Sequence, residues 1–509
     1  MIRSALLLAL LLQGILPVAE AAERFPGASL DYYFDRPGED AGYSIRQTRD
    51  GGYLVAGTSA GPDGDKDLAL WKFDNALQPD PDFAEQGMLR LGSSADDLAM
   101  DAIQVLDASG EADGYLVLGY AAAADRDFSA ENHRGGMDTL ILRLDNHGLP
   151  DPDWHNNGVL FWGGEADDSP LTDPVQPGKP GESGEPGEPG ESGHRILQMG
   201  ESFIILTHTR SRGGDLAGSV TTDPAGGQDA VLLKLDANGQ VDSNFAEQGL
   251  LRLGKLPGRQ PGDEFLFSLA ELHSGHLVVV GYTTGQAVSR ETAGNHNRNQ
   301  LASVDTDMVV VKLSAAGRLQ EDWGNAGTVV IGGSGQDQAF FLSEDNDRRL
   351  LISGRSNSND GDFSGRSTGG DGMLLLRLLQ DGSVDRRFAQ IGALLLSSGD
   401  GQFQQALTLR DYSIAAMGFS RSNEGIFALT DEPDQQGQVI LALVGETGER
   451  QFLFSIGATG EDRANALLLD REGNLLLSGF RSPPPDTPGD QETVSKQRQL
   501  WVSRYELGF

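Results

Sequence analysis

One segment recurs five times along this chain, and its recurrence limits the fold more than any other feature of the sequence. Residues 228–254 carry it in full, with copies at 67–92, 138–163, 307–332 and 371–397. Each copy has an apolar run, a polar turn, an aromatic residue followed four positions later by glycine, and a second apolar run. The aromatic residues, here called the plugs, are Phe83, Trp154, Phe245, Trp323 and Phe388. Such repetition predicts an array of equal structural units.

Around this segment, each unit contains four short runs, a to d, that are typical of β-strands. Run a lies at 43–47, 102–106, 195–199, 266–269, 339–342, 406–409 and 464–469, and run b closes six times with glycine, at Gly57, Gly119, Gly281, Gly354, Gly418 and Gly479. Run c opens with Asp67, Asp138, Asp229, Asp307 and Asp371, and run d lies at 88–91, 159–162, 250–253, 328–331, 393–396 and 451–456. Runs rich in Val, Ile and Leu and separated by glycine predict an all-β protein.

The number of runs predicts how the array closes. Runs a, b and c occur seven times, but only six d runs follow them, because the chain ends after the last c. The missing d is expected at 30–34, since this run is followed by Gly38-Glu39-Asp40 just as 452–456 is followed by Gly460-Glu461-Asp462. Closing a ring in this way hides sheet edges. We therefore predict a single domain over 22–509, a seven-bladed β-propeller closed by an N-terminal strand.

Composition excludes several classes of partner and site. Lys and Arg number 39 against 75 Asp and Glu, a net charge of −36, so nucleic acid and anionic membranes are not expected partners. The same charge also serves solubility. There is no cysteine, which excludes disulfides, thiolate metal sites and a catalytic Cys. The eight His residues fall at unrelated places in the repeats, which argues against a symmetric His metal site.

Residues 1–21 have the pattern of a secretory signal. Arg3 gives the positive start, 5–19 the apolar core and Ala19-Glu20-Ala21 the cleavage site. Gln13 and Pro17 interrupt the apolar run, which is too short for a membrane span. We expect an exported monomer, in the periplasm or outside the cell.

A Pro/Gly/Glu-rich insert at 170–193 separates units two and three. Within it, 178–192 is five Gly-x-y triplets, the period of collagen. The insert is interpreted either as a trimerisation stalk or as a solvated polyproline-II loop.

Two parts of the repeat resemble known bacterial repeats. Residues 236–253 (DANGQVDSNFAEQGLLRL) resemble the delta-60 repeat, with D-x-x-G-x-x-D, an aromatic residue and a glycine before the next strand. Residues 455–479, like 42–57, resemble SBBP-type repeats of exported bacterial propellers. The resemblance implies fold and export and brings no catalytic residues. Unit six departs from it, because 445–450 replaces the long aromatic hairpin.

No nucleophile–base pair, phosphate-binding glycine loop or H-E-x-x-H motif occurs in the sequence. The plug aromatics are interpreted as packing between blades, with a ligand-stacking cage as the alternative, and burying each contributes about 1.5–3 kcal/mol.

Acidic loops are the candidate metal sites. Asn359, Asp360 and Asp362 place oxygen ligands at the short spacing that Ca²⁺ needs, and 63–65 and 125–127 echo them. No full EF-hand register is present, and turns made by Asp, Asn and Gly explain these loops equally well.

An Asp recurs where run d passes to run a. These residues, the acidic ring, are Asp40, Asp97, Asp168, Asp263, Asp337, Asp400 and Asp462. The ring is predicted near the mouth of the central channel, on the face that carries the d–a and b–c loops. One interpretation is that converging carboxylates attract cations or a basic partner; the other is that each accepts hydrogen bonds from its own loop.

The preferred function is that of a non-catalytic exported module that binds a protein or glycan through the d–a/b–c face. The alternatives are a hydrolase or lyase with its active site at the channel mouth, and a structural surface or matrix component.

Overall fold

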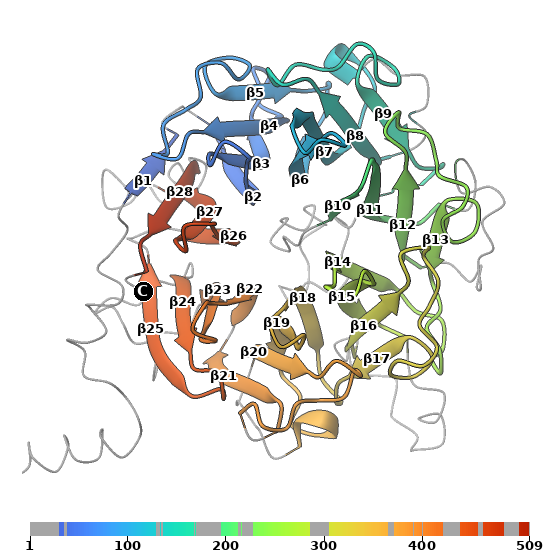
Figure 1. Cartoon of the computed structure of the whole chain (residues 1–509), viewed down its shortest axis with the longest axis vertical. Helices are drawn as coiled ribbons and strands as arrows, with labels where there is room; N and C mark the ends of the chain where they lie inside the picture. Colours follow the sequence, from blue (N-terminus) through green and yellow to red (C-terminus); the bar gives the residue numbers. More distant parts are fainter. Residues whose placement is uncertain are drawn as a thin grey trace, which may run out of the picture.

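The computed structural model describes residues 30–34, 38–128, 133, 136–166, 168, 195–211, 215, 227–285, 305–364, 371–389, 391–399, 401–420, 438–456, 462–482 and 498–507. Seven four-stranded sheets stand around a central axis in chain order (Figure 1). Neighbouring strands in each sheet are antiparallel, and in six of the seven sheets they follow one another in chain order from the inside outward. The all-β, seven-bladed propeller predicted from the repeats is confirmed.

Six blades are continuous in sequence. Blade one is β2 (Ala41–Gln47), β3 (Tyr53–Ala60), β4 (Lys66–Phe73) and β5 (Met88–Leu91); blade two is β6 (Asp97–Leu106), β7 (Ala112–Ala121), β8 (Asp138–Leu144) and β9 (Val159–Trp162); blade three is β10 (Ile196–Met199), β11 (Ser202–Thr209), β12 (Asp229–Leu235) and β13 (Leu250–Leu253). Blade four is β14 (Glu264–Glu271), β15 (Leu277–Thr283), β16 (Asp307–Leu313) and β17 (Thr328–Ile331); blade five is β18 (Asp337–Glu344), β19 (Leu350–Ser356), β20 (Asp371–Leu378) and β21 (Ala393–Gly399); blade six is β22 (Gly401–Thr408), β23 (Ile414–Ser420), β24 (Gln438–Val444) and β25 (Arg450–Ile456).

Blade seven joins the two ends of the chain. It consists of β26 (Asp462–Leu469), β27 (Leu475–Arg481), β28 (Gln499–Tyr505) and the N-terminal β1 (Leu30–Tyr33). In Figure 1 the blue β1 lies beside the red β28, and the two are antiparallel with Asp31 opposite Ser503. The strand expected at 30–34 therefore supplies the outer edge of this blade. The signal pattern of 1–21 and the insert at 170–193 fall outside the described residues.

The glycine that closes strand b has a steric reason. Strand a carries a β-bulge in several blades, for example between Leu266 and Ser268. A side chain on Gly281 would place its Cβ 1.9 Å from the Phe265 carbonyl oxygen, and one on Gly354 would lie 1.9 Å from that of Gln338. Only glycine lets the two backbones approach so closely.

The plug aromatics pack between blades, as the first interpretation of them held. Phe83, Phe245 and Phe388 are almost fully buried. Each plug of blades one to four lies against a turn glycine of the next blade, so a Cβ on Gly148 would lie 2.4 Å from Phe83 and one on Gly317 2.6 Å from Phe245. A backbone hydrogen bond from Ala246 N to Ala316 O (2.8 Å) runs beside the second of these contacts. The plugs thus stabilise blade-to-blade packing.

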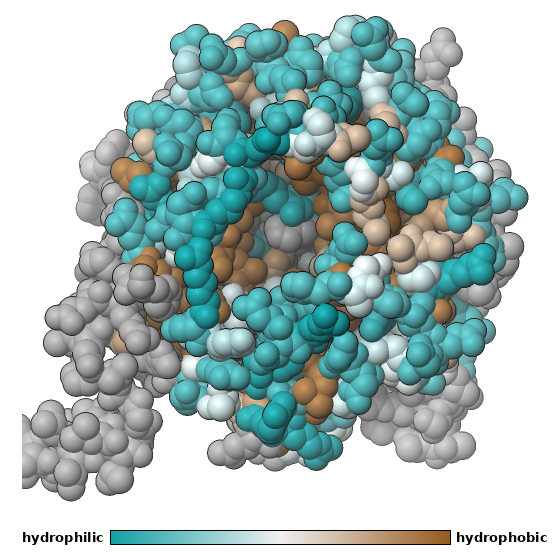
Figure 2. Space-filling view, viewed as in Figure 1, coloured by the Kyte–Doolittle hydropathy of each residue, from teal (hydrophilic) through white to brown (hydrophobic). Residues whose placement is uncertain are grey.

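The antiparallel sheets place the a–b and c–d loops on one face of the ring and the b–c and d–a loops on the other. Figure 2 shows a mostly hydrophilic rim, with hydrophobic side chains gathered around the central hollow. Within the described ranges, no helix is long and apolar enough to cross a membrane; the two helical turns named there are η1 (Arg126–Phe128) and η4 (Gly361–Phe363).

Candidate functional site

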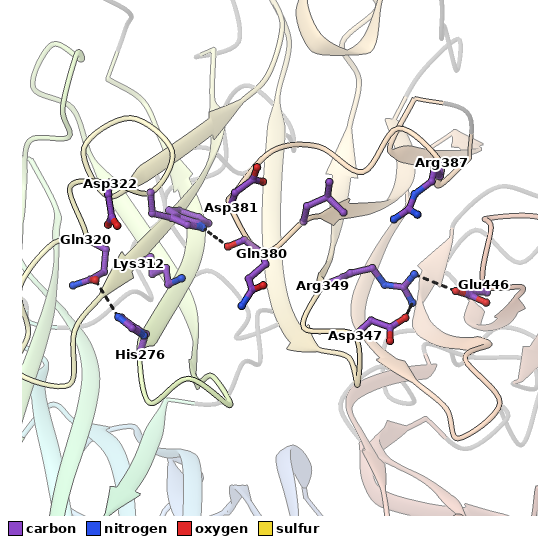
Figure 3. A pocket seen from close by; sticks show the side chains of 12 residues that line it. His276, Lys312, Gln320, Asp322, Asp347, Arg349, Gln380, Asp381, Arg387 and Glu446 are labelled. Carbon is purple, nitrogen blue, oxygen red and sulfur yellow. Dashed lines mark hydrogen bonds and ion pairs between the residues drawn. The ribbon is translucent and has the colours of Figure 1, made fainter.

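A cavity of about 840 Å³ opens on the a–b/c–d face, across blades four, five and six. Its lining comes from the a–b loops of blades four and five, the c–d loops of the same blades and the c–d turn of blade six. The lining residues are His276, Lys312, Gln320, Asp322, Trp323, Asp347, Arg349, Leu379, Gln380, Asp381, Arg387 and Glu446 (Figure 3). Most of them are charged or carry amide groups, so the cavity suits a polar ligand.

One wall is held by two arginines that are tied to carboxylates. Arg349 pairs with Asp345 at 2.6 Å. It also pairs with Asp347 at 3.3 Å and, across to blade six, with Glu446 at 3.1 Å (Figure 3). Burial acts to lower the pKa of Arg349, but the hydrogen bonds to Asp345 and Glu446 outweigh it and raise that pKa. The Arg349 guanidinium therefore links blade five to blade six through its ion pairs.

Behind this wall lies a second buried pair. Arg377 and Asp385 are 2.9 Å apart, with side chains only 5% and 1% exposed. Arg387, which is 76% exposed, adds a contact of 3.1 Å to the same carboxylate. Burial acts to raise the pKa of Asp385, but the hydrogen bonds from Arg387 and its backbone N–H, with the charge of Arg377, lower it. Asp385 therefore stays ionised and holds both arginines in place.

The opposite wall is built by blade four. Gln320 Oε1 lies 3.0 Å from His276 Nε2, and the indole N–H of Trp323 donates to Gln380 O at 3.1 Å (Figure 3). Lys312 Nζ lies 5.7 Å from the centre of the Trp323 ring, within the range of a cation–π contact. The cation of this wall, Lys312, therefore lies beside an aromatic ring, whereas Arg349 and Arg387 are paired with carboxylates.

Three carboxylates of the acidic ring, those of Asp97, Asp168 and Asp337, are buried and accept hydrogen bonds from nearby loop groups. Asp97 accepts from Ser93 N at 2.5 Å, Asp337 accepts from Ser358 Oγ and Gly333 N at 2.7 Å, and Asp168 accepts from Gly164 N at 2.5 Å. Asp40 and Asp462 are also buried, and Asp400 lies outside the described residues. These contacts favour the second interpretation of the ring, hydrogen bonding within each loop.

Burial raises the pKa of three of these ring carboxyls despite the hydrogen bonds that oppose it, to about 7 for Asp97, to about 6 for Asp337 and above its usual value for Asp168. In blade four, the predicted ring residue Asp263 does not occupy the position that Asp337 has in blade five. Glu264 occupies it, because Glu264 lies opposite Thr283 on strand b just as Asp337 lies opposite Ser356. Burial first, then the charges of Asp229 and Asp263, raises the pKa of Glu264 to about 9. Asp263 instead accepts from Gln228 N at 2.7 Å.

The candidate Ca²⁺ loop lies at η4, in the b–c loop of blade five. Asp360 accepts from Ser334 N at 2.7 Å and Asp362 from Gly332 N at 3.0 Å, while Asn359 is exposed. Blade two repeats this arrangement, with Asp125 bound to Ser94 N and Asp127 to Gly92 N. In both blades the loop caps the preceding d–a turn. Among the described residues, no group of three or more His, Asp or Glu is arranged to hold a metal ion.

The Asp residues that open strand c explain why a glycine, such as Gly92 or Gly332, follows strand d. A Cβ on Gly92 would lie 1.9 Å from the carboxylate of Asp67, and one on Gly332 would lie 1.8 Å from that of Asp307. Arg259 also reaches Asp307, at 2.5 Å. The repeated glycine after strand d therefore makes room for a repeated carboxylate.

No protein-family model matches this chain, and no curated protein sequence matches it. The resemblance to delta-60 and SBBP-type repeats therefore stays a prediction. Similar solved structures include a protein of unknown function from Dyadobacter fermentans, 11% identical with a TM-score of 0.38, which covers 94% of this chain and 99% of the other.

Two further solved structures are similar at the same low level. A Mycobacterium tuberculosis puromycin-hydrolyzing peptidase is 13% identical with a TM-score of 0.38, over 87% of this chain and 50% of the peptidase. A Trypanosoma rangeli sialidase is 11% identical with a TM-score of 0.36, over 95% of this chain and 60% of the sialidase. At these scores the similarities carry no inference about activity, and the assignment of this chain to the seven-bladed β-propeller fold stands on its seven sheets.

Proposed function

We propose that this chain is an exported, non-catalytic module that binds a protein or glycan ligand through the cavity of blades four to six. The observation that carries the proposal is the cavity itself, to which three blades contribute side chains. A rigid ring that presents polar groups from several loops is the usual setting for recognition.

The proposed binding site lies on the a–b/c–d face of the ring, whereas the sequence predicted binding on the d–a/b–c face. Asp97, Asp168 and Asp337 of the d–a loops are buried and accept hydrogen bonds from neighbouring loop groups, whereas the cavity is formed by the a–b and c–d loops. The long b–c loops at 209–228 and 283–306 lie largely outside the described residues, as does part of the loop at 121–136, and binding there stays a prediction. Export likewise stays a proposal that rests on the signal pattern of 1–21.

The test is a binding screen of the mature chain against glycan and peptide panels, with two matched variants. Gln380 is exposed at the cavity, and its backbone carbonyl, not its side chain, accepts from Trp323. Gln380→Trp should therefore fill the cavity without breaking this hydrogen bond. Ala237 is the equivalent exposed position in blade three, where its carbonyl accepts from Trp154 Nε1 at 3.0 Å, so Ala237→Trp is the control.

We expect the wild type and Ala237→Trp to retain the same panel members and Gln380→Trp to lose them. Equal retention by both variants would place binding elsewhere on the ring. Cleavage of a panel member by the wild type would favour the hydrolase or lyase, and retention of nothing at all would favour the structural component.

A further inference from the structure

A cation recurs near the end of strand c and is paired with an acid of its own blade. In blade three, Lys234 pairs with Asp242 at 2.9 Å, and in blade five Arg377 pairs with Asp385 at 2.9 Å, in both cases with the acid eight residues later.

In blade one, Lys72 lies 3.4 Å from Asp80 and 2.8 Å from Asp50 of the a–b turn. In blade two the partner is Asp113, near the start of β7, 2.8 Å from Arg143. In these four blades the cation is therefore neutralised within the blade.

Blade four differs from these blades at the position of the acid eight residues later. Lys312 has Gln320 at the position of the acid, and the backbone bond is unchanged, since Gln320 N donates to Lys312 O at 3.0 Å as Asp242 N does to Lys234 O at 2.9 Å. The Gln320 amide is bound to His276 instead. Within the described part of the chain, no carboxylate lies within ion-pair distance of Lys312, whose ammonium lies near the Trp323 ring.

The uncommitted ammonium faces the cavity. In Figure 3, the side chain of Lys312 lies between those of His276 and Gln380. The other cations of the cavity are engaged, Arg349 by three carboxylates and Arg387 by Asp385. Lys312 is therefore the cation that a bound anion can neutralise without displacing an internal ion pair.

The remaining lining limits the kind of anion. Asp322, Asp381 and Glu446 line the same cavity and would repel a polyanion such as a phosphate or sulfate chain. A single carboxylate carries one charge, which one ammonium can balance. The side chains of His276, Gln320 and Gln380 offer hydrogen bonds to hydroxyl or amide groups beside that carboxylate.

From these contacts, and resting on the proposed binding function, we infer that the cavity binds a polar monocarboxylate, with Lys312 as the residue that pairs with the carboxylate. A sugar acid and an N-acylated amino acid share this chemistry. Gln320 is a specificity residue of the site, because its amide leaves the ammonium available.

The test is calorimetric titration of the mature chain with glucuronate, N-acetylglycine and, as the uncharged control, glucose. The wild type should bind at least one of the two carboxylates and not glucose, and the stronger of the two identifies the source of the carboxylate. Lys312→Met removes the charge and keeps the length of the side chain. Gln320→Asp restores the acid of the other blades and should occupy the ammonium.

Both substitutions should weaken carboxylate binding by about tenfold or more. Gln320→Asp should do so with a melting temperature at or above that of the wild type, which separates loss of binding from loss of folding. Lys234→Met removes the paired lysine of blade three, outside the cavity, and should leave binding unchanged.

The inference is overturned if the wild type binds neither carboxylate, or if Lys312→Met and Gln320→Asp bind as well as the wild type. Should the glycan and peptide panels still yield a ligand that Gln380→Trp loses while Gln320→Asp keeps it, the carboxylate assignment alone fails and the proposed function stands.

Discussion

The contact between Phe245 and Gly317 makes the packing of blade three on blade four measurable. Gly317 has φ +75°, and a Cβ there would lie 2.6 Å from Phe245 Cζ. Gly275, in the a–b turn of blade four, also has φ +75°, but nothing lies within 4 Å of its added Cβ. Alanine at either position bears the same backbone cost, about 1–2 kcal/mol. Only at Gly317 does overpacking add about 1–3 kcal/mol, because the buried ring has no room to move.

Gly317→Ala should therefore lower the free energy of unfolding by about 2–5 kcal/mol, and Gly275→Ala by about 1–2 kcal/mol. Urea unfolding followed by tryptophan fluorescence measures both. Combining Gly317→Ala with Phe245→Leu should cost less than the sum of the single changes, because the smaller side chain relieves the clash. Equal destabilisation by the two glycine variants would refute the plug as an interblade contact.

Three further outcomes follow from the structure. Glu264 is protonated in the folded state up to a pKa of about 9 and ionised in the unfolded chain above about 4.5, so the folded state binds the extra proton and stability falls as pH rises between these values. The advantage of Glu264→Gln over the wild type should thus grow by up to about 1.4 kcal/mol per pH unit from pH 5 to 8 in urea unfolding, and a constant difference would contradict this pKa. Deleting residues 22–35 removes β1 and leaves the edge of β28 unpaired, so light scattering should show aggregation or the melting temperature should drop; an unchanged monomer would disprove closure. Since Asp360 and Asp362 already accept backbone hydrogen bonds, millimolar Ca²⁺ should leave the melting temperature unchanged, whereas a rise that Asp360→Asn abolishes would restore the calcium interpretation.

The strands were predictable because each repeat carries its own steric markers. The glycine that closes strand b and the glycine of the c–d turn recur because backbone or ring atoms leave no space for a Cβ, as at Gly354 and Gly148. Counting the d runs was enough to expect a strand at 30–34 in blade seven, and β1 pairs there with β28.

The sites were less predictable, because they depend on how loops from different blades meet. Recurrence placed Asp337 at the start of strand a, but only the turn geometry turns its carboxylate toward Gly333 N and the hydroxyl of Ser358. Comparison of the repeats predicted Asp263 as the ring residue of blade four. In the structure the next residue, Glu264, occupies the position that corresponds to Asp337 of blade five.

The cavity gave one signal in the sequence, the glutamine that replaces the repeated acid at position 320. The other residues that line the cavity could not be predicted from the sequence. Arg349 and Glu446, for example, belong to different blades and meet only when the ring is assembled. Substitution of a recurrent charged residue is therefore the feature to follow in such repeats.

Closure of the ring by its two ends is the claim on which the rest depends, and a disulfide tests it directly. Asp31 lies opposite Ser503 in the β1–β28 pair, and their side chains are hydrogen-bonded. The native chain has no cysteine, so Asp31→Cys with Ser503→Cys introduces the only two thiols. We predict that mild oxidation of the folded double variant removes both thiols, yields a monomer two mass units lighter, and links the peptides that contain residues 31 and 503. Two free thiols after oxidation of a folded, monomeric double variant would contradict the closed seven-bladed ring.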